Sequence, residues 1–113
     1  MHEVGITQSI VEIAEKHARE QGAAKITAIT VEIGALSGVV PEAVEFCFEA
    51  VSRETMLAEA RLIIERLPGR GRCRECGAET EIDRFTFVCP QCDAMALETV
   101  QGEELRIKEM EVD

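Results

Sequence analysis

Four of the five cysteines fall in two closely spaced pairs and are the residues best suited to chemistry. They form the pattern Cys73-x2-Cys76-x12-Cys89-x2-Cys92. Each pair can present two thiolates from one tight turn, and the loop between the pairs can bring the two turns together. Because four thiolates in such an arrangement suit tetrahedral Zn²⁺, the sequence predicts a structural zinc site.

Residues beside the cysteines support this interpretation. Gly77 directly follows Cys76 and Asp93 directly follows Cys92, at positions where the turn of a zinc knuckle needs a positive φ that Gly and Asp tolerate. A disulfide framework is typical of exported chains, and nothing in the sequence indicates export. Two alternatives use the same thiolates. One is a rubredoxin-like iron site in an electron carrier, and the other is a zinc-ribbon adaptor that binds RNA or a polymerase.

The N-terminus is the second candidate metal site. The α-amino group of Met1 has a reference pKa of about 7.7 to 8.0, so it can lose its proton near neutral pH and bind a metal. The imidazole of His2 can close a chelate with it, the backbone nitrogens between them add donors, and Glu3 offers a carboxylate oxygen. Cu(II) and Ni(II) favour square-planar nitrogen sites of this kind. The alternative interpretation is a histidine on a frayed terminus that binds no metal.

Two further residues invite a metal interpretation but fit structural roles better. His17 and Cys47 both fall on apolar faces of predicted helices, where a core histidine and a small buried cysteine are the commoner outcomes. The chain has no nucleophile elbow, no P-loop and no glycine-rich dinucleotide fingerprint. We therefore predict no enzyme activity.

The charge of the chain restricts its partners. Its 113 residues carry 12 Lys plus Arg against 22 Asp plus Glu, a formal net charge of −10 that repels nucleic-acid phosphates and anionic membranes. No apolar run approaches the ~20 residues of a membrane span, and the start Met1-His2-Glu3 lacks the basic residues of a signal peptide. We expect a cytoplasmic protein with neither a nucleic-acid nor a membrane partner.

Helices and strands alternate before the cysteines. A first helix is predicted over residues 5–21, with a capping-box pattern from Ser9 to Glu12. A strand over residues 25–33 follows, then a helix that Pro41 opens, then a strand over residues 60–67. The predicted apolar faces are Ile6, Ile10, Ile13 and His17 on the first helix and Val44, Cys47, Phe48 and Val51 on the second.

The cysteines lie in a segment that interrupts this unit. Pro68-Gly69 breaks the strand pattern, and residues 69–100 form a lobe so small that metal must stabilise it. Residues 104–112 alternate again, with a bulge near Glu109, and should return as a third strand because two strands make a poor sheet. The fold class is therefore α+β, with two helices packed on a small three-stranded sheet and an inserted four-cysteine zinc-ribbon lobe. The predicted domains are residues 1–68 plus 101–113, and residues 69–100.

Several of these features together resemble one known family. The start Met1-His2-Glu3, the stretch Ile33 to Ser37, the helix around Phe46 to Phe48 and the four-cysteine lobe closing with Gln101-Gly102 are similar to the HypA/HybF family of hydrogenase nickel-incorporation proteins. The resemblance spans essentially the whole chain. It implies a nickel metallochaperone that transfers Ni(II) to the large subunit of [NiFe]-hydrogenase together with a HypB-type GTPase.

The resemblance also implies roles for individual residues. His2 becomes the nickel ligand together with the Met1 amino group and Glu3, so the first domain is the nickel-binding one. Many relatives carry an acid at the position of Val40, whereas here the acid is Glu42, two residues later. The protein is expected to be a monomer or a weak homodimer. The residues implied as ligands of structural Zn(II) are Cys73, Cys76, Cys89 and Cys92.

Overall fold

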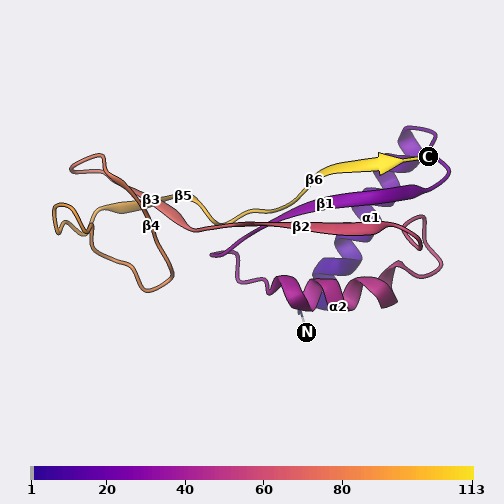
Figure 1. The fold of residues 1–113 in the computed structure, drawn as a ribbon, viewed down its shortest axis with the longest axis horizontal. Helices are drawn as coiled ribbons and strands as arrows, with labels where there is room; N and C mark the ends of the chain where they lie inside the picture. The colour runs from indigo at the N-terminus through magenta and orange to yellow at the C-terminus, as the bar shows by residue number, and fades with distance from the viewer. Residues whose placement is uncertain (1) are drawn as a thin grey trace.

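The computed structural model describes residues 2–113 and contains two separate sheets. The molecule is elongated, with extents of 54 × 28 × 16 Å, and both helices lie at one end (Figure 1). The two three-stranded sheets have the orders β2-β1-β6 and β4-β3-β5. The elements are α1 (His2–Glu20), β1 (Ile26–Gly34), α2 (Pro41–Ser52), β2 (Arg61–Leu67), β3 (Arg70–Cys73), β4 (Glu79–Glu81), β5 (Leu97–Gln101) and β6 (Leu105–Val112).

The larger sheet is built around β1. This strand pairs in parallel with β2 and antiparallel with β6, and α2 supplies the crossover that a parallel pair needs. Ile29, Val31 and Ile33 of β1 form one core cluster with residues of both helices. The predicted α+β arrangement, with the C-terminal segment returning as the third strand of this sheet, is confirmed. So is the bulge near Glu109, because β1 pairs with Glu109 and then with Ile107, leaving Lys108 as the extra residue.

The predictions for α1 were wrong in two respects. The helix is already formed at His2, and Ser9 is an exposed residue inside it rather than part of a capping box. Its buried face is also shifted from the predicted one, because Ile13 is 50% exposed and the side chain of His17 is 62% exposed. The prediction placed the larger isoleucines against the sheet. In the structure the small side chains of Ala14 and Ala18 lie there, and they let the helix approach the sheet closely. The buried residues are Thr7, Ile10, Val11, Ala14 and Ala18.

The second helix follows its prediction. Pro41 lies in the first turn of α2 after an extended Val40, where its missing N–H leaves no hydrogen bond unmade. Val44 and Phe48 are buried in the core, while Cys47 is only partly buried beside them. The helix therefore holds Val40 and the preceding loop at a fixed place beside the sheet.

Three glycines pack together where the two sheets meet. A Cβ on Gly34 would lie 2.0 Å from the carbonyl oxygen of Gly102, and a Cβ on Gly102 would lie 2.7 Å from the Cα of Gly69. The N–H of Leu36 donates to the Gly102 carbonyl over 2.6 Å. This junction fixes the loop that follows β1, because its first residues are hydrogen-bonded to the chain returning from the small sheet.

Candidate metal centres

The four predicted cysteines come together at the end of the small sheet. Their sulfur atoms all lie within 4.8 Å of one another, and two pairs, Cys73 with Cys92 and Cys76 with Cys89, have Sγ–Sγ distances of 3.6 Å. A tetrahedral site with Zn–S bonds of about 2.3 Å separates its sulfurs by about 3.8 Å. The sulfur positions therefore fit a zinc ion.

Two matching turns place these sulfurs. The N–H of Gly77 donates to the carbonyl of Cys73, and the N–H of Asp93 donates to the carbonyl of Cys89, each over 2.9 Å. Gly77 has φ 78° and Asp93 has φ 62°, as the sequence predicted. Because both pairs adopt the same local turn, the sequence spacing is sufficient to build each half of the site. The pairing of β3 with β5 then holds the halves together.

The electrostatics of the four thiols favour a bound cation. The backbone amide of Cys76 lowers the pKa of Cys73 to about 7. For Cys92, the Ala94 amide lowers the pKa, but the neighbouring Cys73 sulfur and burial outweigh it and raise the pKa to about 12. Sulfurs this close repel one another's negative charge, so they do not all ionise together without a counter-charge. A dication supplies that charge, and the donor set therefore suits a metal.

The second candidate site lies at the start of α1. The side chain of His2 is 64% exposed, and its Nε2 atom lies 3.0 Å from a carboxylate oxygen of Glu3 and 3.4 Å from the carbonyl oxygen of Gly38. Burial raises the pKa of Glu3, but the backbone N–H groups of Glu3 and Val40, together with His2, lower it overall. Met1 lies outside the described residues. The structure thus brings a charged carboxylate beside an exposed imidazole.

Helical geometry keeps the backbone nitrogens at this terminus available. The first four N–H groups of an α-helix have no acceptor within the helix, so a metal that replaces the amide proton of His2 breaks no helical hydrogen bond. His2 is the first residue of α1. The contact with Gly38 links residues 36 positions apart, which is why sequence patterns did not reveal it.

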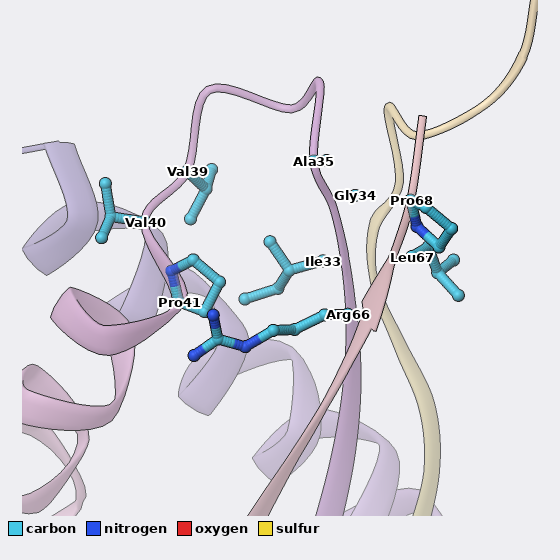
Figure 2. A pocket seen from close by; sticks show the side chains of 9 residues that line it. All are labelled: Ile33, Gly34, Ala35, Val39, Val40, Pro41, Arg66, Leu67 and Pro68. Atoms are coloured by element: carbon cyan, nitrogen blue, oxygen red, sulfur yellow. The ribbon is translucent and has the colours of Figure 1, made fainter. Parts of the chain in front are cut away.

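Glu42 pairs with an arginine of β2. Its carboxylate lies 2.9 Å from the guanidinium of Arg66 on β2, and its own backbone amide and this pairing lower its pKa. The Arg66 side chain extends toward Pro41 across a cavity of about 400 Å³ (Figure 2). Val40 is linked to Glu3 through its backbone amide.

His17 and Cys47 form no metal cluster. His17 lies on the surface of α1, with Nδ1 3.7 Å from a carboxylate oxygen of Glu20, so its interpretation as a core histidine was wrong. Its helix is rotated so that Ala14 and Ala18 face the core instead. Within residues 2–113, the four cysteines are the one group of three or more candidate ligands close enough to share an ion.

Comparison with known proteins identifies the family. A family model described as "Hydrogenase/urease nickel incorporation, metallochaperone, hypA" matches residues 1–112. The chain belongs to the HypA family. Hydrogenase maturation factor HypA of Geobacter metallireducens is 56% identical over 113 residues, and that of Geobacter sulfurreducens is 51% identical, each alignment covering both chains completely.

Solved structures agree with this assignment. The solution structure of the Ni metallochaperone HypA from Helicobacter pylori matches with a TM-score of 0.69 and 25% identity, covering 97% of this chain and 96% of that one. A second solution structure of a HypA protein matches with a TM-score of 0.74 and 26% identity, covering 100% and 97%. The similarity extends over both sheets.

Membership in the HypA family settles the class of function. HypA proteins are nickel metallochaperones and hydrogenase maturation factors rather than enzymes, so this chain works with the hydrogenase maturation machinery. The electron carrier and the zinc-ribbon adaptor are thereby set aside as functions. Nickel is the transferred metal of the family, and the four-cysteine cluster fits structural zinc. Neither described helix is long and apolar enough to cross a membrane.

Proposed function

We propose that this chain binds Ni(II) at its N-terminus through the Met1 amino group, His2 and Glu3. The observation that carries the proposal is the exposed imidazole of His2 beside the charged carboxylate of Glu3, at a helix start whose amides have no helical acceptor. A donor set built from a chain terminus is open, so it releases metal to an acceptor more readily than a closed four-thiolate site. This openness suits transfer of a metal rather than its retention.

The acceptor in this proposal is the large subunit of [NiFe]-hydrogenase, reached in the cytoplasm with the help of a HypB-type GTPase. Cu(II) binds nitrogen sites more tightly than Ni(II) does. Selectivity for nickel must therefore come from the metal supply and from docking to these partners. With purified proteins, we expect nickel-loaded chain to transfer its metal to the immature large subunit, and His2→Ala to bind the same partners without transferring nickel.

The zinc site has a structural role in this proposal. Its ligands are Cys73, Cys76, Cys89 and Cys92, in a domain of residues 69–100, while residues 1–68 plus 101–113 form the nickel-binding domain. The small sheet has little apolar core of its own, since its buried cluster consists of two of the cysteines and Ala96. A lobe with so few buried apolar residues depends on metal binding for its folding free energy.

Metal stoichiometry tests the two sites together. Elemental analysis of untagged protein should find one zinc per chain without added nickel, and one zinc plus one nickel after loading. The His2→Ala variant, or one extra residue before Met1, should abolish nickel binding and leave zinc content and circular dichroism unchanged. His17→Ala is the matched control, because it removes the other histidine from the same helix. Undiminished nickel affinity in both N-terminal variants would overturn the proposal.

A further inference from the structure

An apolar groove runs along the free edge of the larger sheet. β6 is an outer strand of this sheet, and α1 lies behind it (Figure 1). Two adjoining cavities of about 530 and 510 Å³ open between β6 and α1, and both are lined by Ile10, Ile13 and Leu105. Ile13 is 50% exposed and Leu105 is 39% exposed. The apolar layer between helix and sheet is therefore left uncovered at this edge.

The bulge at Lys108 keeps all the apolar residues of β6 on one face of the sheet. The apolar residues of the strand pair with the core residues of β1, so they lie on the side of the helices. The charged residues of the strand occupy the opposite face of the sheet, where Arg106 pairs with Glu32 and Lys108 pairs with Glu65. The apolar set consists of Leu105, Ile107, Met110 and Val112, and the charged set of Arg106, Lys108, Glu109 and Glu111.

Aligned antiparallel to itself, β6 is complementary in both sets. On the helix side, Leu105 meets Val112 and Ile107 meets Met110; on the other side, Arg106 meets Glu111 and Lys108 meets Glu109. Apolar and opposite-charge neighbours of this kind stabilise a strand pair, whereas like charges destabilise it. Glu109 and Glu111 form no ion pair within the described part of the chain. A second β6 would supply one to each.

We propose that a second copy of this chain docks antiparallel on the β6 edge, joining the two larger sheets into one six-stranded sheet. A two-fold dimer requires a surface that is complementary to itself, and the β6 pattern has this property. The two-fold axis passes between Lys108 and Glu109, so the bulge, which weakens edge pairing, lies at the centre and leaves three residues on each side to pair. The docked copy covers the groove and its two cavities.

This dimer is weak because two copies that each carry a net charge of −10 repel one another. It therefore forms only as the protein concentration rises. One of the two cavities reaches His2 and Gly5, so the second copy lies beside the N-terminus. The proposal does not depend on nickel binding, and the two can fail separately. Loss of nickel binding in His2→Ala leaves the β6 edge unchanged.

Charge-reversal variants test the proposal. Dimerisation of the zinc-loaded full chain is measured by sedimentation velocity over a series of protein concentrations. The wild-type chain should dimerise as its concentration rises. Arg106→Glu and Glu111→Arg should each weaken dimerisation roughly tenfold or more, since each replaces two attractive cross-strand pairs by two repulsive ones. An equimolar mixture of the two variants should dimerise again, because in the mixed dimer each side chain at position 106 faces a side chain of opposite charge at position 111.

Two controls change the charge equally at another surface. Arg53→Glu and Glu59→Arg lie at exposed positions at and beyond the end of α2 and should leave dimerisation unchanged. If Arg106→Glu fails to fold without its pair to Glu32, then Glu111→Arg carries the test alone, since it breaks no ion pair within the described part of the chain. A wild-type chain that stays monomeric, or a mixture that does not recover, would overturn the proposal. Capture of a different protein by this edge, lost in Glu111→Arg, would also overturn it.

Discussion

The three-glycine junction makes a quantitative prediction for Gly102→Ala. Gly102 has φ 122°, a region that L-residues rarely adopt, and a Cβ there would lie 2.7 Å from the Cα of Gly69 and 3.0 Å from a methyl carbon of Leu36. The backbone strain costs roughly 1–3 kcal/mol. Overpacking against the neighbouring backbone costs roughly another 1–3 kcal/mol. The free energy of unfolding should therefore fall by roughly 2–6 kcal/mol, a large share of the total for a small protein.

Two other glycines separate the two contributions. Gly38 has φ 81°, but a Cβ there would meet no atom within 4 Å, so Gly38→Ala should cost only the backbone strain of about 1–2 kcal/mol. Gly5 lies inside α1 with open space around it, and Gly5→Ala should stabilise the helix by roughly 0.5–1 kcal/mol. From most to least stable, the expected order is then Gly5→Ala, wild type, Gly38→Ala and Gly102→Ala.

Thermal unfolding of zinc-loaded protein, followed by circular dichroism, measures this order. For a domain of about 100 residues, 1 kcal/mol shifts Tm by about 4–8 °C, so Gly102→Ala should lower Tm by at least about 8 °C. Gly38→Ala should lower it by roughly half as much. Equal losses in Gly102→Ala and Gly38→Ala would refute the reasoning, because they would show that the junction has room for a methyl group.

Three further predictions follow from the two metal centres. Removing zinc with a chelator should unfold residues 69–100, which hydrogen exchange would show as a loss of amide protection. The helical signal of α1 and α2 should remain. Unchanged amide protection in residues 69–100 would contradict a structural role for zinc. The pKa of Glu3 is lowered from 4.5, so its contribution to stability is present above pH 4.5 and is lost as the pH falls below that value. Glu3→Gln should therefore make the free energy of unfolding less dependent on pH in the acid range. An NMR titration of the wild-type chain in which the Glu3 carboxyl has a midpoint above 4.5 would contradict this prediction. Glu42→Gln should leave nickel affinity, measured by calorimetry, within about twofold of wild type, because Glu42 pairs with Arg66; a large loss would place Glu42 at the nickel site.

Local signals predicted much of the fold correctly. Pro41 marked the start of α2, and the phase change between Ile107 and Met110 predicted the bulge that the structure contains at Lys108. These features depend on residues close together in the sequence, so a single chain shows them. The buried face of α1 was not predictable in this way. Helical spacing fits both the face of Ile6 and Ile13 and the face of Ala14 and Ala18, and contact with the sheet decides between them.

The two candidate sites also differ in how far the sequence predicted them. The cysteine spacing alone predicted the two turns and the positive φ of Gly77 and Asp93, because each turn involves only neighbouring residues. The surroundings of His2 and Glu3 needed the fold, since Gly38 contacts His2 and the amide of Val40 bonds to Glu3 from a segment that is distant in the sequence. Glu42 lies two residues after Val40 in the sequence, and only the fold showed that its carboxylate pairs with Arg66 of β2.

The sequence by itself determined the chemistry that this protein has available: four thiolates in two knuckles, and a histidine beside the chain terminus. Both depend on covalent spacing, which folding does not change. Tertiary structure decided which groups face one another. It left Ile13 of α1 exposed beside an open groove, placed Gly38 against His2, and left the self-complementary strand β6 at an edge. These are contacts between distant segments, and they follow from packing of the whole chain rather than from any local pattern.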